Sequence, residues 1–194
     1  MYDRDHGWSE LSVIWELYTP YKDSSFDIGR ISSVYLNEDK TLIKRCFKPR
    51  GITVSGKHSD LIDEYVEQKW LTETTHLTKF QLMPWVPELI AIDYVDRYTI
   101  QRYYGPDLLI AGYADIPDIE DQVVDIYKFF QDQNVYKLNG ALSNMTKHNK
   151  KVIMFDFKYM RPRTPEMKLQ AEYEIDEWLS KIGTSIVPRL KELL

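Results

Sequence analysis

The chain has 194 residues and a net charge of −5, and 43% of its residues are hydrophobic. That length is enough for one domain, or for two small lobes around a buried core. Its longest apolar runs, such as VIMF at 152–155, fall far short of the roughly 20 residues of a bilayer-spanning helix. The negative charge argues against a general nucleic-acid coat, although the basic run at 43–51 leaves contact with phosphates open.

The cysteine count and the N-terminus bear on the cellular compartment. The single cysteine, Cys46, cannot form an internal disulfide, and the sequence shows no cysteine and histidine spacing for zinc. The N-terminal stretch MYDRDHGWSE is charged where a signal peptide would be apolar. We therefore expect an intracellular, cytoplasmic protein without a membrane anchor.

The first half of the chain predicts two β-hairpins with a helix between them. Residues 26–47 alternate as two strands joined by the polar turn NEDK. Ser59 and Asp60 are typical of a helix start, and apolar residues follow at helical spacing, which gives the helix one buried face. Residues 88–104 again predict two strands, with a turn near Asp96 and an end at Gly105.

The second half predicts helices around one more hairpin. Residues 116–134 form an amphipathic pattern of helical period, and residues 144–157 predict two short strands around a basic turn. Thr164 and Pro165 are typical N-cap and first-turn residues of a long helix, and a short helix follows near the C-terminus. The order is β-hairpin, helix, β-hairpin, helix, β-hairpin and two helices, which indicates an α+β protein.

Asp156 is unusual because it lies in the apolar run VIMFDF. Burial of a carboxylate is costly unless a cation or hydrogen-bond donors meet it. A bound metal ion would meet that need. The alternative is a carboxylate that caps a turn or pairs with Lys158.

From residue 26 to residue 157 the chain resembles the protein-kinase-like superfamily. The similarity is to small atypical kinases that act on lipopolysaccharide or within tRNA-modification complexes. That family's catalytic loop has an aspartate, an asparagine five positions later, and a hairpin that ends in an aspartate between Phe and Gly. Asn139, Asn144 and Asp156 stand at these places.

The resemblance implies a two-lobe kinase-like fold that binds ATP and Mg²⁺. We expect a small antiparallel β-rich N-lobe over residues 1–104 and a truncated, mainly helical C-lobe over 105–194. Phosphoryl transfer relies on positioning and charge neutralisation, so Asn144 and Asp156 would be the oxygen ligands of the metal.

The first hairpin would supply contacts to the nucleotide. The stretch IGRISSVYL resembles a glycine-rich loop that keeps Gly29, with Ser32 and Ser33 where further glycines would be. Val34 would pack on the adenine. Lys44 would be the strand lysine that contacts the phosphates, and Lys48 is the rival.

The resemblance also implies an acidic partner and a hinge. Glu67 would pair with the strand lysine from the helix, with Glu64 as the alternative, because an unpaired buried ammonium would lose its proton. The backbone from Gln101 to Tyr103 would face the adenine. These assignments depend on predicted helix and strand boundaries.

Asn139 departs from the family pattern, since an amide cannot take the proton of an acceptor hydroxyl. Loss of a general base slows transfer by about 10²-fold or more. Asn139 would then mark an inactivated variant, a natural pseudokinase, or an enzyme with another base such as Asp156 or a water. Lys158 replaces the glycine after Asp-Phe, and no Ala-Pro-Glu motif follows.

The expected function is an ATP- and Mg²⁺-dependent phosphotransferase that acts on a protein or another macromolecule, with Asn139, Lys44 and Asp156 at its catalytic centre. The alternative is a pseudokinase that serves as a nucleotide-binding or scaffold module. A further alternative is a small α+β interaction protein without nucleotide. The acceptor and the oligomeric state stay open.

Overall fold

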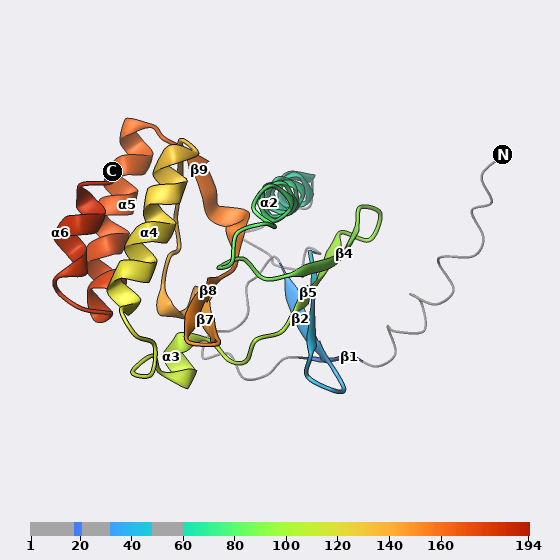
Figure 1. Cartoon of the computed structure of the whole chain (residues 1–194). Helices are drawn as coiled ribbons and strands as arrows, with labels where there is room; N and C mark the ends of the chain where they lie inside the picture. The colour runs from blue at the N-terminus through green and yellow to red at the C-terminus, as the bar shows by residue number, and fades with distance from the viewer. Residues whose placement is uncertain (1–17, 21–31, 48–59) are drawn as a thin grey trace.

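The structure is a computed structural model that describes residues 18–20, 32–47 and 60–194. The predictions for Gly29 and Lys48 fall outside these residues. The described chain forms an N-terminal lobe, built from a sheet and one long helix, and a mainly helical C-terminal lobe beside it (Figure 1). The predicted α+β class is confirmed.

The sheet of the N-terminal lobe has five antiparallel strands in the order β1-β2-β3-β5-β4. Two hairpins, β2–β3 and β4–β5, meet where β3 pairs with β5. The two hairpins predicted from the sequence are thus confirmed. The strands are β1 (Tyr18–Pro20), β2 (Ser33–Asn37), β3 (Leu42–Cys46), β4 (Leu89–Asp93) and β5 (Tyr98–Arg102).

The turn between β2 and β3 fixes which side chains face the C-terminal lobe. Asn37 Oδ1 accepts hydrogen bonds from the backbone N–H groups of Thr41 and Leu42 at 2.9 and 2.8 Å. In the resulting register Val34 lies opposite Arg45. Because paired residues share one face of a sheet and neighbours alternate, Arg45 lies on the face of Val34, and Lys44 lies on the other.

Helix α2 (Asp60–Lys79) is the long helix of the N-terminal lobe. Its buried side chains Val66, Trp70, Glu73 and Leu77 recur every three or four residues, which places them on one face of the helix. Val66 and Trp70 pack on Phe47 at the end of β3. The same helix contacts segments of the C-terminal lobe, so it bridges the two lobes.

The C-terminal lobe follows residues 103–107 and contains helices around two short two-stranded sheets, β6 with β9 and β7 with β8. The predicted hairpin at 144–157 and the predicted helices are present, and Thr164 caps its helix by accepting the Met167 N–H. The elements are α3 (Leu108–Ala111), α4 (Ile119–Asp132), β6 (Val135–Lys137), η2 (Leu142–Asn144), β7 (Met145–His148), β8 (Lys151–Met154), η3 (Phe157–Tyr159), β9 (Met160–Pro162), α5 (Pro165–Glu177), η4 (Leu179–Lys181) and α6 (Ile186–Lys191).

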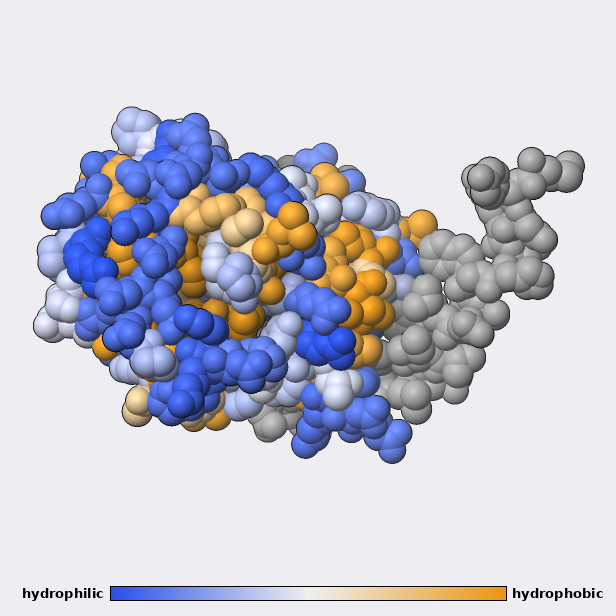
Figure 2. Space-filling view, in the orientation of Figure 1, coloured by the Kyte–Doolittle hydropathy of each residue, from blue (hydrophilic) through white to orange (hydrophobic). Residues whose placement is uncertain are grey.

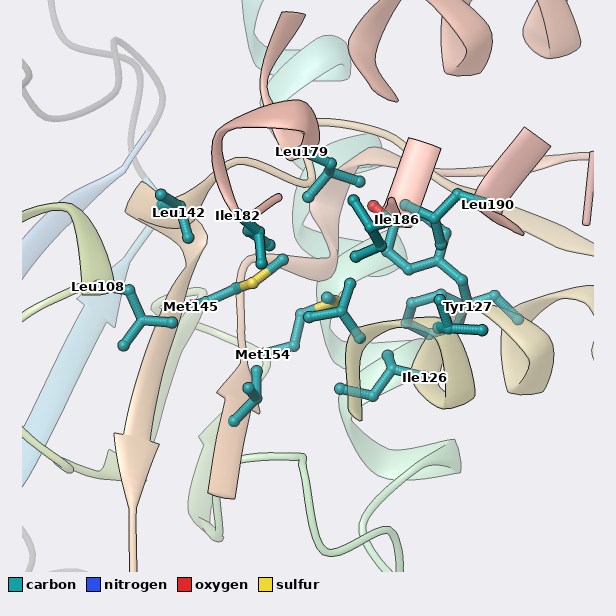
Figure 3. Packing of buried hydrophobic residues seen from close by; sticks show 14 of the residues in the cluster. Leu108, Ile126, Tyr127, Leu142, Met145, Met154, Leu179, Ile182, Ile186 and Leu190 are labelled. Atoms are coloured by element: carbon teal, nitrogen blue, oxygen red, sulfur yellow. The ribbon is translucent and has the colours of Figure 1, made fainter. Parts of the chain in front are cut away.

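The main hydrophobic core lies in the C-terminal lobe and holds the β7–β8 hairpin in place. Met145 of β7 and Met154 of β8 are fully buried against side chains of α4 and α6, among them Ile126, Ile186 and Leu190 (Figure 3). Full burial of such a side chain contributes about 1.5–3 kcal/mol. The core thereby fixes both ends of a hairpin that is flanked by Asn144 and Asp156.

The surface of the face shown in Figure 2 is divided by polarity. Hydrophilic residues cover most of the C-terminal lobe, and hydrophobic residues gather nearer the middle of the molecule. Among the described residues, no helix is both long and apolar enough to cross a membrane.

Candidate nucleotide site between the lobes

A cavity of about 470 Å³ lies between the two lobes. Its volume is within the range of about 300–1,000 Å³ that is usual for small-molecule sites. Val34 and Ile43 line it from the sheet, and Leu142 and Phe155 line it from the C-terminal lobe. Charged side chains, among them Arg45, also line the cavity. The cavity therefore has apolar walls and a charged part.

Asp156 is the centre of the charged part of the cavity. It is 5% exposed and adopts a left-handed backbone conformation with φ 66° and ψ 60°. Its Oδ1 lies 2.8 Å from Arg45 Nη1 and 2.8 Å from Lys158 Nζ. Burial acts to raise the pKa of the Asp156 carboxyl, but the charges of Lys158 and Arg45 outweigh it and hold the pKa well below its usual range. Two cations thus meet the buried carboxylate.

Glu73 of α2 completes this charged cluster. Its Oε1 lies 3.4 Å from Arg45 Nη1, and the residue is fully buried. Its Oε2 has no hydrogen-bond partner among the described residues. Burial raises the pKa of Glu73 although the charge of Arg45 opposes the shift. Arg45 of β3 and Glu73 of α2 thus form an ion pair between the sheet and the long helix.

The expected placement of Lys44 in the cavity is corrected, because Lys44 does not line it and Arg45 does. The Lys44 ammonium lies 4.6 Å from the centre of the Tyr98 ring, on the face of the sheet opposite to Arg45. A shift of one residue in a strand exchanges the two faces. Lys44 and Arg45 are adjacent in one strand and therefore lie on opposite faces, and the register of β3 decides which of them faces the cavity.

The expected pairing of Glu67 with a basic residue of β3 is likewise corrected, because Glu73 of the same helix contacts Arg45 instead. Glu67 is exposed on α2 and lies 3.6 Å from Arg97, and the alternative Glu64 is exposed as well. Glu73 lies six positions after Glu67, and this is more than one and a half helical turns. Glu73 lies four residues before Leu77 and three after Trp70, and this spacing was the available signal.

The loop before β7 is held through its backbone. Asn139 has a left-handed conformation with φ 57°, which asparagine tolerates better than most residues. Its N–H donates to Glu174 Oε2 on α5. Its carbonyl oxygen accepts from Asn144 Nδ2 at 2.7 Å and from Lys137 Nζ at 3.3 Å. Sequence reasoning missed the contribution of Glu174, because no local pattern links it to Asn139.

Lys137 is a buried cation beneath this loop. It is 3% exposed, and its ammonium donates to the carbonyl oxygens of Leu138 and Asn139. Burial lowers the pKa of Lys137 to about 8, although the negative charge of Asp156 acts in the opposite direction. Lys137 occupies the place where protein kinases have a histidine, and it supports the loop carbonyl groups.

Most of the other residues predicted to contact the nucleotide line the cavity, and one does not. Ser32, Val34, Gln101 and Tyr103 line the cavity together with Asn139, Asn144 and Asp156, and Ser33 does not. The Tyr103 N–H donates to the carbonyl oxygen of Thr41 at 2.9 Å. This N–H is therefore already paired within the N-terminal lobe, and the contact of the backbone from Gln101 to Tyr103 with an adenine stays a prediction.

The arrangement fits a divalent cation poorly. Two carboxylates line the cavity, Asp107 and Asp156. The Asp107 carboxylate caps α3 by accepting from the Ile110 N–H, and two cations already contact Asp156 Oδ1. The amide of Asn144 uses its nitrogen on Asn139, which leaves only its side-chain oxygen as a second ligand. The described residues contain no cluster of three acidic, histidine or cysteine side chains for a metal. The Lys158 ammonium already contacts the Asp156 carboxylate at 2.8 Å.

Comparison of the sequence with protein-family models and with curated proteins finds no match. Comparison with solved structures finds kinases. The Rio2 kinase from Chaetomium thermophilum superposes with a TM-score of 0.59 at 9% identity, over 95% of this chain and 76% of that one. WbdD in complex with the kinase inhibitor LY294002 gives a TM-score of 0.58 at 12% identity, over 85% of this chain.

A second structure of WbdD, described as a bifunctional kinase-methyltransferase, gives a TM-score of 0.56 at 10% identity. The chain spans less than half the length of WbdD, with 43% and 44% of that protein covered in these two matches. At such low identity the likeness concerns the fold alone. The strand order, the bridging helix and these matches show that the chain has a protein-kinase-like two-lobe fold.

Proposed function

We propose that the chain is a nucleotide-binding module of the kinase fold that lacks fast phosphoryl transfer, and is thus a pseudokinase. The observation that carries the proposal is the cavity between the lobes, where Arg45, Asn139, Asn144 and Asp156 come together. Arg45 comes from the N-terminal lobe, and the other three come from residues 139–156 of the C-terminal lobe. A ligand-binding site requires such polar and charged side chains around one cavity.

The chemistry of the cavity suits a nucleoside triphosphate such as ATP. Val34 and Leu142 offer apolar surface to a base, and Arg45 and Lys158 offer positive charge to phosphates. An arginine is suited to phosphate because its planar guanidinium donates several hydrogen bonds at once. A ligand with one flat apolar end and one anionic end would use both parts of the cavity.

Asn139 limits what the site does with such a ligand. Its backbone is fixed by Glu174, Asn144 and Lys137, so the loop keeps its shape without the family's aspartate. An amide does not accept a proton from an acceptor hydroxyl, and general-base loss slows transfer by about 10²–10⁴-fold. Binding therefore persists in this proposal and transfer does not.

A thermal-denaturation series with ATP tests the binding step. A ligand that binds only the native state stabilises it by about 2.7 kcal/mol at a hundred times its dissociation constant. We expect the melting temperature to rise with ATP concentration, and to keep rising with the logarithm of that concentration above the dissociation constant. An unchanged melting temperature at all ATP concentrations would remove nucleotide binding and favour an interaction protein without nucleotide.

A phosphotransferase is the second candidate, because one feature of the catalytic loop is preserved. Asn144 Nδ2 donates to the carbonyl oxygen of Asn139 at 2.7 Å, so the asparagine of the kinase-like pattern is tied to the residue five positions before it. In this reading the acceptor would be a protein or another macromolecule, and Asn139 would be the main defect.

The substitution Asn139→Asp separates the two candidates. Transfer of labelled phosphate from ATP to protein is measured before and after the change. The pseudokinase proposal predicts little gain, because Lys158 also departs from the family pattern, which has glycine two residues after the aspartate. A gain of about 10²-fold or more would favour the phosphotransferase. Asn149→Asp, at an exposed turn asparagine that also has a positive φ, is the matched control.

A further inference from the structure

The ion pair between Lys158 and Asp156 is the feature of the cavity that the kinase resemblance does not explain. The pattern has glycine at this position, and glycine brings no charge. Lys158 is only 6% exposed and yet lines the cavity. Its ammonium lies 2.8 Å from Asp156 Oδ1, within the distance of a charge-assisted hydrogen bond.

The charges nearest to the Asp156 carboxylate are two cations, Arg45 and Lys158, each 2.8 Å from Oδ1. Glu73 also contacts Arg45, at 3.4 Å. A phosphate group in the cavity would be attracted by Arg45 and Lys158, whereas a divalent cation at Asp156 would be repelled by both. Both effects are strong because the effective dielectric constant is low in a buried site.

The two cations nearest to Asp156 come from opposite lobes. Arg45 belongs to β3 of the N-terminal lobe, and Lys158 belongs to η3 of the C-terminal lobe. Both contact the same carboxylate oxygen, and both line the cavity. A phosphate group placed beside that oxygen would lie between two cationic donors that are already fixed in position, so little side-chain ordering would be needed on binding.

We propose that this cavity binds the phosphate groups of a nucleotide directly through Lys158 and Arg45, without a divalent cation. Lys158 supplies the positive charge that a metal ion would otherwise bring to Asp156. This inference rests on the proposed nucleotide binding and adds to it a role for Lys158 and an independence from Mg²⁺.

Calorimetric titration of the full chain with ATP, at constant ionic strength, tests the inference. One series contains EDTA and the other contains MgCl₂. We expect the dissociation constant in EDTA to equal or to lie below the one in MgCl₂, since Mg²⁺ would withdraw negative charge from the ATP. Binding that occurs only with MgCl₂ overturns the inference and leaves the proposed function standing.

Substitution of Lys158 tests the residue itself. Lys158→Met is expected to weaken ATP binding in EDTA by about tenfold, which corresponds to about 1.4 kcal/mol. Lys158→Arg keeps the charge and is expected to retain most of the affinity. Lys151→Met is the matched control, because Lys151 is exposed on β8 and does not line the cavity. An unchanged affinity of Lys158→Met in EDTA would overturn the role of Lys158.

Two further ligands separate a phosphate contact from a structural role. Adenosine lacks phosphates, so Lys158→Met is expected to leave its affinity unchanged, and tripolyphosphate is expected to compete with ATP. Equal losses for adenosine and ATP would show a general disruption of the cavity and overturn the phosphate contact. If ATP binds in neither buffer while circular dichroism shows a folded chain, the proposed function itself fails. If Lys158→Met does not fold, the comparison of EDTA with MgCl₂ on the unaltered chain still decides the inference.

Discussion

The low pKa of the Asp156 carboxyl is caused by two cations, one close in sequence and one from the other lobe. Lys158 is two residues away in sequence, whereas Arg45 comes from the other lobe, and both nitrogens lie 2.8 Å from the same oxygen. The carboxylate is buried, and its charge is retained because these cations offset the desolvation. The three groups form one unit whose members depend on each other.

Asp156→Asn is expected to lower the free energy of unfolding at neutral pH by about 3–5 kcal/mol, since it leaves buried cations without their partner. The folded-state pKa of Asp156 lies below its ordinary value of 3.8, so its contribution is present above that pH and is lost as the pH falls below it. Urea unfolding of both proteins across that pH range measures the difference. A constant difference at all pH values would contradict the assignment.

The register of β3 gives a prediction for two neighbouring cations. Arg45→Met is expected to weaken ATP binding about tenfold or more, because the guanidinium would lie at the phosphates. Lys44→Met is expected to leave the affinity within about twofold, because Lys44 packs over Tyr98 on the opposite face. Calorimetry of the two variants is the measurement. Equal losses of ATP affinity would contradict the placement of Arg45, and not Lys44, on the cavity face of β3.

The sequence predicted part of this residue chemistry. The apolar run around Asp156 indicated a buried carboxylate, and pairing with Lys158 was one of two alternatives considered. The contact with Arg45 could not be predicted, because it joins residues 111 positions apart. Lys44 and Arg45 are adjacent basic residues of one strand, so only the strand register could show which of them faces the cavity.

Helix α2 links the two lobes at the level of secondary structure. One face packs on the sheet through Trp70, whose ring centre lies 5.3 Å from that of Phe47. Further along the same face Glu73 reaches Arg45, and the helix also contacts η3, which carries Lys158. The orientation of this helix therefore sets the geometry of the charged cluster.

Trp70→Ala is expected to lower the free energy of unfolding by about 3–5 kcal/mol, as is usual when a buried aromatic residue is truncated. Trp70 is 2% exposed. The adjacent Leu71 is 48% exposed, so Leu71→Ala is the matched control and is expected to change stability by about 0.5 kcal/mol or less. Urea unfolding compares the two. A larger loss for Leu71→Ala would mean that α2 presents a different face to the sheet.

The loop before β7 approaches helix α4 closely at Gly140. A Cβ atom at this position would overlap with the Tyr127 hydroxyl and lie 3.3 Å from the Tyr127 Cζ. Gly140→Ala is expected to destabilise the protein by about 1–3 kcal/mol through overpacking. Tyr127→Phe should reduce that loss in the double variant, and a double-mutant cycle measures the coupling. Additive losses would contradict the close approach.

Elements with strong local signals were predicted well. The alternating strands of both hairpins and the capped start of α5 at Thr164 agree with the structure. The acidic residue of α2 was predicted wrongly because the second half of the helix, TETTHLTK, is polar in sequence. Val66, Trp70 and Leu77 nevertheless define its buried face, and tertiary contacts extend that face to Glu73.

At the scale of the molecule, the described residues form two lobes (Figure 1), and a cavity lies between them. The order of predicted elements and the spacing of Asn139, Asn144 and Asp156 pointed to a kinase-like fold, and the structural matches to Rio2 and WbdD agree with that fold. The sequence could not predict which charged groups surround Asp156, the expected metal ligand. Those groups depend on the side chain of Lys158, on the register of β3 and on the position of α2, which come together only in three dimensions.

A crystal structure of the chain grown with ATP in the presence of EDTA tests the central claim most directly. We predict density for the nucleotide in the cavity between the lobes, with the base beside Val34 and Leu142 and with phosphate oxygens within hydrogen-bond distance of Arg45 and Lys158. Nucleotide on another surface, or an empty cavity at saturating ATP, would contradict the account.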